Sequence, residues 1–263
     1  MDYKSILVTR DAGIAVITLN CPDKLNALTV ELLTELGVAI DEVGKDDDVR
    51  VVILTAEGKT FCAGANLQHP IFAVESPVQR YREMDLFHKL PLQLRSLPKP
   101  VIAAVNGVVV GAGANLALSC DMIIASDKAR FGQVFVNIGL HVDTGGTYLL
   151  PRSVGVPKAM ELLLTGDLVD ATEAERIGMI NKVVPEADLQ RVTRELAEKL
   201  AAGPPVALAL NKASIYCNLL GDLASALDRE AYCQALILNS EDNKEGIGAF
   251  LEKRKPQFKG FKD

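Results

Sequence analysis

The segment PKPVIAAVNGVVVGAGANLALSC, residues 98–120, decides how the rest of this chain is interpreted. From Pro100 to Cys120 it carries no charged residue, so its length alone would permit a membrane-spanning helix. The pair Asn106-Gly107 interrupts the apolar run, and the β-branched triplet Val108-Val109-Val110 follows it. The segment therefore predicts a buried strand, a glycine-rich turn and a buried helix that begins near Gly113.

The composition fits one large folded core with an appendage. Of the 263 residues, 49% are hydrophobic, which excludes a disordered chain. Lys and Arg number 28 against 34 Asp and Glu, so the net charge of -6 gives no overall basic field for nucleic acid or for an anionic membrane. The five widely spaced cysteines predict reduced thiols and a cytoplasmic location, and the residues after Met1 predict no signal peptide.

Strands and helices alternate in the first part of the chain. Ile6 to Arg10 and Ile14 to Leu19 predict a hairpin, and the continuous apolar run at residues 51–54 predicts a strand covered on both faces. Thr29 is a candidate N-cap for a helix that runs to Val43. Further along, the pair of Asp170 and Glu173 predicts another helix start.

The sequence Gly203-Pro204-Pro205 is the clearest boundary in the chain. We expect a strand-rich core over residues 1–203 and a helical region over residues 204–263. The helices predicted for this region span Val206 to Leu219, Leu223 to Leu238 and Gly246 to Lys255.

Two segments place small residues where a predicted strand ends. They are Ala63-Gly64-Ala65 and Gly111-Ala112-Gly113, and small residues let a ligand approach the backbone closely. Two backbone N–H groups that converge on one oxygen form an oxyanion hole, although such turns also serve packing alone. The histidines His69, His88 and His141 have no partner at metal-ligand spacing, so no metal site is predicted.

Asp143 is the carboxylate that the pattern singles out. It lies in LHVDTGGT, residues 140–147, where apolar chain gives way to a predicted helix. An aspartate there can cap the helix N-terminus, or it can act as a catalytic acid or base. The residues alone leave both interpretations open.

Several motifs together resemble the crotonase (enoyl-CoA hydratase/isomerase) superfamily over essentially the whole chain. The resemblance implies an α/β spiral of ββα units followed by C-terminal helices that mediate trimerisation. The motifs that carry it are VILT (52–55), FCAGANL (61–67), PKPVIAAVNG (98–107), GAG (111–113), CD (120–121), FG (131–132), GGT (145–147), LTG (164–166) and the end of the chain from Glu245-Gly246 to Phe258.

The resemblance implies an acyl-CoA thioester substrate and an oxyanion hole for its enolate. The two donors at the matching positions are the backbone N–H groups of Ala65 and Ala112. No cofactor is implied, because coenzyme A enters as part of the substrate, and the implied assembly is a homotrimer or homohexamer. The positions implied in substrate binding are Lys24, Ala27, Ala63, Gly64, Asn66, Leu67, Gly111, Asn115 and Phe135, and also Phe258 and Lys259, which reach the coenzyme A of a neighbouring subunit.

The chain departs from the hydratase pattern at the two glutamates that hold water in that branch. Asn115 and Phe135 stand at those positions, and neither exchanges a proton as a carboxylate does. Asp143 matches the aspartate of 1,2-epoxyphenylacetyl-CoA isomerases, which also shift 3-enoyl-CoA to 2-enoyl-CoA. The benzoyl-CoA dehalogenase branch uses an aspartate at this position as a nucleophile.

The prediction is an acyl-CoA isomerase of fatty acid or aromatic acid catabolism, with Asp143 as acid and base. It would shift a double bond or isomerise a ring epoxide through a thioester enolate. One alternative is a hydratase or lyase in which Asp143 alone orients water. The other is a non-catalytic acyl-CoA binding subunit.

Overall fold

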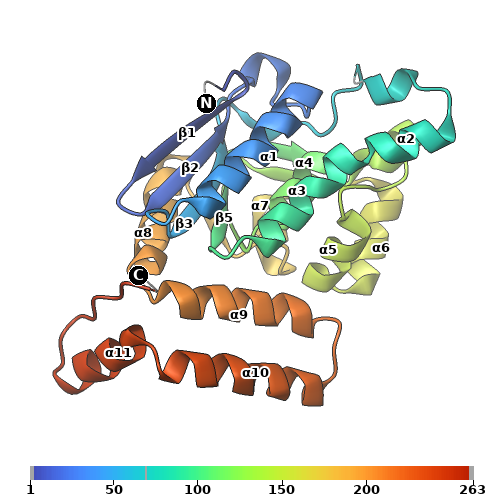
Figure 1. The fold of residues 1–263 in the computed structure, drawn as a ribbon. Helices are drawn as coiled ribbons and strands as arrows, with labels where there is room; N and C mark the ends of the chain where they lie inside the picture. Colours follow the sequence, from blue (N-terminus) through green and yellow to red (C-terminus); the bar gives the residue numbers. More distant parts are fainter. Residues whose placement is uncertain (1–2, 69, 261–263) are drawn as a thin grey trace.

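The computed structural model describes residues 3–68 and 70–260, and its strands form two sheets (Figure 1). The larger sheet has the strand order β1-β2-β3-β5-β7-β10, and the smaller has the order β4-β6-β8-β9. The strands of the larger sheet are β1 (Ile6–Asp11), β2 (Ile14–Leu19), β3 (Val51–Ala56), β5 (Val101–Val105), β7 (Met122–Ser126) and β10 (Lys182–Val184). Those of the smaller sheet are β4 (Thr60–Cys62), β6 (Val108–Val110), β8 (Arg130–Gly132) and β9 (Leu168–Asp170).

A repeating unit generates both sheets. In the pairs β3/β4, β5/β6 and β7/β8, the first strand joins the larger sheet and the second joins the smaller one. Each strand lies parallel to its counterpart in the preceding pair. Helices follow β4 and β6 (Figure 1). Each unit of two strands and a helix is therefore added beside the preceding one in the same direction, which makes a spiral. The predicted α/β spiral of ββα units is confirmed.

Helices cover the faces of the larger sheet, and two of their predicted starts are confirmed. Thr29 Oγ1 accepts a hydrogen bond from Leu32 N, and Asp170 Oδ1 accepts one from Glu173 N. The helices of this part are α1 (Val30–Lys45), α2 (Pro77–Glu83), α3 (Asp85–Ser96), α4 (Ala112–Leu118), α5 (Gly146–Val154), α6 (Val156–Thr165), α7 (Ala171–Arg176) and α8 (Leu189–Ala201). Short 3-10 turns are η1 (Pro22–Lys24), η2 (Pro70–Ala73), η3 (Val134–Ile138) and η4 (Glu186–Asp188).

The apolar segment at residues 98–120 folds as β5, β6 and α4 in the core. Val101, Ala103 and Val105 of β5 pack in one buried cluster with residues of α1, α3 and α4. Ile102 and Ala104 face a second cluster that includes residues of α8. Cover on both faces explains why the strand has no polar side chain. Among the described residues, no helix has the length and apolar character needed to cross a membrane.

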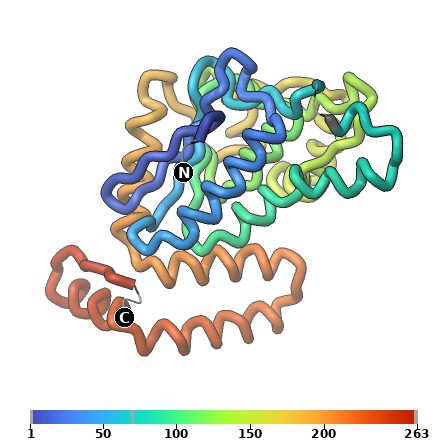
Figure 2. The backbone as a smooth tube through the Cα atoms, turned by 45° about the horizontal axis from the view of Figure 1, so that its top comes forward, coloured from blue at the N-terminus to red at the C-terminus, as the bar shows by residue number. Residues whose placement is uncertain are grey.

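The last three helices extend from the body of the molecule (Figures 1 and 2). They are α9 (Pro205–Asn218), α10 (Leu223–Leu238) and α11 (Glu241–Leu251). The predicted bounds of the last helix, Gly246 to Lys255, are wrong. Ser240 Oγ accepts a hydrogen bond from Asn243 N and caps the helix before Gly246, and the helix ends at Leu251.

Candidate active site

Two neighbouring parallel strands place the glycine-rich segments side by side. β4 leads into Ala63-Gly64-Ala65 and β6 leads into Gly111, so both segments leave the same edge of the smaller sheet. A Cβ atom on Gly64 would lie 3.0 Å from Val110 O and 3.6 Å from Ala112 N. The backbones therefore touch, and only glycine leaves room for this approach.

The N–H groups of Ala65 and Ala112 are free to act as donors. Ala112 is the first residue of α4, so its N–H has no acceptor inside the helix. Beside Ala65, Leu28 N donates to Gly64 O and Asn66 N donates to Leu28 O. Within residues 3–68 and 70–260, neither N–H donates a hydrogen bond to the protein. Paired free donors of this kind can hold an oxygen that gains negative charge.

Gly111 sets the direction of the second donor. Its φ of 56° and ψ of -131° lie in a region that residues with a side chain rarely adopt. This conformation joins the end of β6 to α4, so the chain turns sharply just before Ala112.

Asp143 lies in the loop before α5, and it does not cap that helix. The N-cap of α5 is Gly145, without a side-chain cap, so the capping interpretation is wrong. The Asp143 carboxylate instead accepts a hydrogen bond of 2.8 Å from Thr144 Oγ1. Burial raises the pKa of Asp143, while the Thr144 hydrogen bond and the charges of His88 and His141 act in the opposite direction.

Asn115 joins α4 to the loop of Asp143, and Phe135 lies beside Gly111. Asn115 is fully buried, and its Nδ2 donates to the main-chain O of Asp143 at 2.8 Å. Phe135 is also buried, and its ring lies 3.8 Å from where a Cβ atom on Gly111 would stand. Among these three side chains, Asp143 alone carries a carboxyl group.

The loop that contains Lys24 lies against the first glycine-rich segment. Asn26, which the sequence did not single out, holds this loop: its fully buried side chain donates to Glu57 O and Thr60 O and accepts from Cys21 N. Lys24 itself is exposed on η1. Asn26 has a left-handed φ of 51°, a conformation that asparagine tolerates better than most residues.

The structure brings most of the predicted site residues together, but not all of them. The residues that lie around the two glycine-rich segments are Lys24, Ala27, Ala63, Gly64, Ala65, Asn66, Leu67, Gly111, Ala112, Asn115, Phe135 and Asp143. Phe258 and Lys259 lie elsewhere in the chain's own fold. Arg50, just before β3, donates to Phe258 O, and Lys259 N donates to Asp242 of α11.

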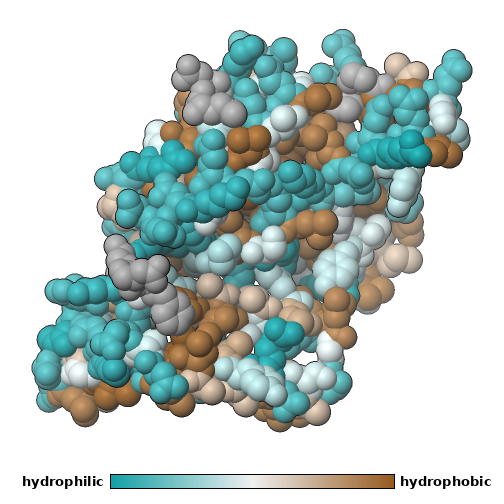
Figure 3. All heavy atoms as spheres, in the orientation of Figure 1, coloured by the Kyte–Doolittle hydropathy of each residue, from teal (hydrophilic) through white to brown (hydrophobic). Residues whose placement is uncertain are grey.

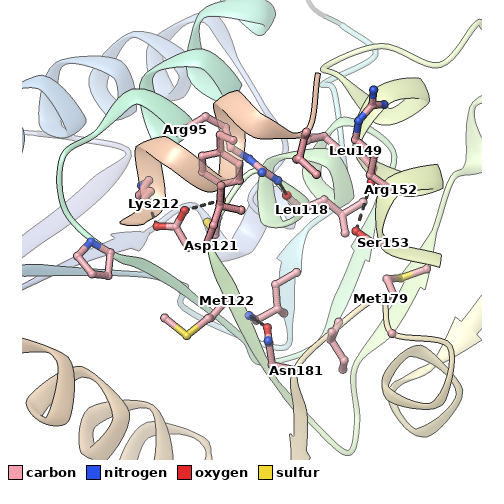
Figure 4. A pocket seen from close by; sticks show the side chains of 18 of the residues that line it. Arg95, Leu118, Asp121, Met122, Leu149, Arg152, Ser153, Met179, Asn181 and Lys212 are labelled. Carbon is pink, nitrogen blue, oxygen red and sulfur yellow. Dashed lines mark hydrogen bonds and ion pairs between the residues drawn. The ribbon is translucent and has the colours of Figure 1, made fainter. Parts of the chain in front are cut away.

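A separate cavity of about 440 Å³ lies where α9 packs on the core (Figure 4). Asp121, the carboxylate that lines it, already has partners. Lys212 Nζ contacts Asp121 Oδ2 at 2.7 Å, and Tyr216 OH donates to Asp121 Oδ1. Lys212 also donates to the main-chain O atoms of Leu94 and Lys99. These contacts anchor α9, and none of the candidate catalytic residues lines this cavity.

No group of three or more His, Cys, Asp and Glu side chains in the described chain is placed to hold a metal ion. His88 and His141 belong to the described residues, whereas His69 lies outside them. All five cysteines are unpaired.

Comparison with known proteins agrees with this geometry. Residues 9–261 match the family model described as enoyl-CoA hydratase/isomerase. The chain is 40% identical to 1,2-epoxyphenylacetyl-CoA isomerase from Escherichia coli, over 97% of this chain and 98% of the relative. It is 38% identical to short-chain-enoyl-CoA hydratase from Clostridium acetobutylicum, over the full length of both.

A solved structure shows the same fold. The enoyl-CoA hydratase from Bacillus anthracis superposes with a TM-score of 0.94 at 35% identity, covering 98% of this chain and 100% of the other. The ββα spiral, the paired donors and the match over nearly the whole length agree with one another. The chain belongs to the enoyl-CoA hydratase/isomerase family.

Proposed function

We propose that this enzyme is an acyl-CoA isomerase that converts a 3-enoyl-CoA to a 2-enoyl-CoA. Asp143 takes a proton from C2, next to the thioester, and the electron pair moves onto the thioester oxygen. The N–H groups of Ala65 and Ala112 hold this enolate oxygen. The same carboxyl group then returns a proton at C4, and the double bond moves from C3=C4 to C2=C3.

The observation that carries the proposal is the hydrogen bond from Asn115 of α4, the helix that begins at the Ala112 donor, to the loop of Asp143, which has the one carboxyl group among Asp143, Asn115 and Phe135. Asn115 has both polar atoms of its side chain in hydrogen bonds within the protein, and Phe135 is apolar. A proton shift needs one group that takes and returns a proton. Burial favours that role for Asp143, because it raises the pKa of the carboxyl group toward neutrality.

The donors supply the other part of the rate. Loss of one donor in an oxyanion hole costs about 2.7–4 kcal/mol of transition-state stabilisation, so two backbone donors account for a large share of catalysis. The reaction moves only a proton and a double bond, so we expect no cofactor beyond the coenzyme A of the substrate. Lys24, exposed on its loop, contacts the phosphates of that coenzyme A.

The test is incubation with a panel of 3-enoyl-CoA thioesters that differ in their acyl chains. Formation of a conjugated 2-enoyl thioester is followed by its ultraviolet absorbance, and Asp143→Asn is compared with the unaltered enzyme. We expect turnover of at least one substrate and a loss of about 10²–10⁴-fold in the variant. Absence of turnover on every member of the panel would overturn the proposal.

A hydratase is the second candidate, because a relative of similar identity is a short-chain-enoyl-CoA hydratase. In that case Asp143 alone would orient water for addition to a 2-enoyl-CoA. Oxygen-18 from labelled water in the product identifies hydration, whereas isomerisation introduces none. Full activity of Asp143→Asn on the whole panel would instead indicate that Asp143 is not the group that transfers the proton.

A further inference from the structure

A chain of buried amides connects the core to the loop that carries Asp143. Gln133, just after β8, donates through Nε2 to Asn115 Oδ1 at 2.7 Å. Asn115, on α4, donates through Nδ2 to the main-chain O of Asp143 at 2.8 Å. Asn115 is 0% exposed and Gln133 is 3% exposed, so water does not compete for these hydrogen bonds.

The Asn115 amide also packs directly on this loop. A Cβ atom on Gly146 would lie 2.5 Å from Asn115 Nδ2 and 2.7 Å from its Oδ1, so glycine is required there. Between Asp143 and Gly146 the backbone takes two consecutive left-handed residues, Thr144 with φ 51° and Gly145 with φ 83°. A non-glycine residue holds this conformation only where its surroundings fix it.

The chemistry of the contact requires an amide at position 115. The side-chain nitrogen must donate to the main-chain O of Asp143, and the side-chain oxygen must accept from Gln133 Nε2. An aspartate or glutamate carboxylate has no N–H to donate, so its oxygen would face the Asp143 carbonyl oxygen. Its charge would also raise the pKa of the Asp143 carboxyl group further.

We infer that Asn115, oriented by Gln133, is a positioning residue that fixes Asp143 for proton transfer. The inference rests on the proposed function, since it assigns the role through Asp143. Asn115 acts through the main chain of Asp143 and not by contact with the acyl group, because both polar atoms of its side chain are engaged inside the protein. The side-chain amide of Asn115 thus supplies the N–H donor that holds the main chain of Asp143 in place.

The experiment compares Asn115→Ala and Asn115→Asp with a matched control, Ser119→Ala. Ser119, the C-cap of α4, is also fully buried, and its Oγ donates to Asn115 O at 2.7 Å. The control therefore removes a buried hydrogen bond without changing a contact to the loop of Asp143. We expect Asn115→Ala to lower kcat by about a hundredfold or more with KM nearly unchanged, as misplacement of a catalytic group does. Ser119→Ala lowers Tm but keeps kcat.

Asn115→Asp keeps the size of the side chain and changes only its chemistry. We expect a lower kcat and an acidic limb of the pH profile of kcat/KM that moves to higher pH, because a second carboxylate beside Asp143 disfavours its charged form. The other titratable groups whose charges act on Asp143 are His88, from α3, and His141, from its own loop, and both stay unchanged. Gln133→Met, which removes the orienting donor, lowers kcat to a smaller extent.

Two results separate this inference from the proposed function. If Asp143→Asn is inactive while Asn115→Ala matches Ser119→Ala in kcat, the positioning role is refuted and the proposed function stands. If Asp143→Asn keeps full isomerase activity, the proposed function fails first. If Asn115→Ala does not fold, the pH profile of Asn115→Asp decides, and an unmoved acidic limb with unchanged kcat refutes the role.

Discussion

Asp143 is a residue where stability and chemistry oppose each other. Burial raises the pKa of its carboxyl group in the folded protein above the value in the unfolded chain. Such a group favours folding at low pH, and it opposes folding as the pH rises through the folded-state value. The charged form that serves as a base is therefore the form that weakens the fold.

Asp143→Asn should consequently be more stable than the unaltered protein at pH 8. The advantage shrinks as the pH falls through the raised folded-state pKa to 3.8, the ordinary value, because the carboxyl group becomes protonated and no longer opposes folding. Urea unfolding at the two pH values measures both differences in the free energy of unfolding. Asp167→Asn, at an exposed position, controls for removal of one negative charge. An advantage that grows as the pH falls would contradict the assignment.

At the scale of single residues, the sequence predicted which residue types the site needs, but not which residues contact one another. The small residues before Ala65 and Ala112 follow from local chemistry, since close backbone approach requires them. The amide contact of Asn115 with Asp143 joins residues far apart in the chain, and nothing local distinguishes a buried asparagine from an exposed one. The capping interpretation of Asp143 was wrong because Gly145, with φ 83°, is the N-cap residue of α5.

At the scale of elements, periodicity and apolar runs located most strands and helices. β1, β2, β3 and β5 and the helix start at Thr29 all agree with prediction, because each depends on burial or capping within a few residues. α11 does not, because its N-cap Ser240 precedes Gly246, the predicted start. Which strands become neighbours is a long-range property, and here the resemblance to a family supplied it.

The junction between β6 and α4 gives the prediction at this scale. Gly111→Ala places a side chain where φ is 56° and ψ is -131°, and a Cβ atom would have room, since the Phe135 ring lies 3.8 Å away. The cost is therefore backbone strain of about 1–3 kcal/mol, and its relief turns the Ala112 N–H away from the oxyanion. We expect kcat to fall by about 10²–10³-fold, as for loss of one donor.

Gly139→Ala is the matched control for this junction. Gly139 also has a left-handed backbone, with φ 71°, and nothing lies within 4 Å of an added Cβ atom. The control should lose stability by about 1–2 kcal/mol and keep its kcat. Urea unfolding and steady-state kinetics on both variants separate strain from catalysis. Equal kcat values in the two variants would mean that Gly111 does not set the donor.

At the scale of the whole molecule, the C-terminal helices leave a large apolar surface uncovered. In Figure 3 hydrophobic residues lie along α9 and α10 in the lower part of the molecule, whereas the end that holds α11 is mostly hydrophilic on this face. Monomeric proteins rarely expose apolar patches beyond a few hundred Å². The exposed apolar side chains of α9 to α11 and their connections are Ile215, Leu219, Leu220, Leu223, Leu227, Leu236, Leu238, Ile247, Phe250 and Leu251.

This uncovered surface predicts self-association, and the resemblance to the crotonase superfamily implies a homotrimer or homohexamer, which sedimentation at low micromolar concentration measures. The unaltered chain should sediment at three or six times its mass of 28.3 kDa. Leu227→Asp on α10 should dissociate the assembly, because it places a charge in the surface to be buried. Leu7→Asp, at a leucine that is also exposed but lies on β1, should leave the assembly intact.

We expect the end of the chain to link assembly to substrate binding. Phe258 and Lys259 are held beside Arg50 and Asp242, away from the glycine-rich segments of their own subunit. The resemblance to the crotonase superfamily implies that this segment contacts the coenzyme A of a neighbouring subunit. We expect dissociated Leu227→Asp to show a raised KM for acyl-CoA with a smaller change in kcat, since binding to the remote coenzyme A is lost while Asp143 and both donors stay in place. A dissociated variant whose KM equals that of the assembled enzyme would show that each subunit binds coenzyme A alone.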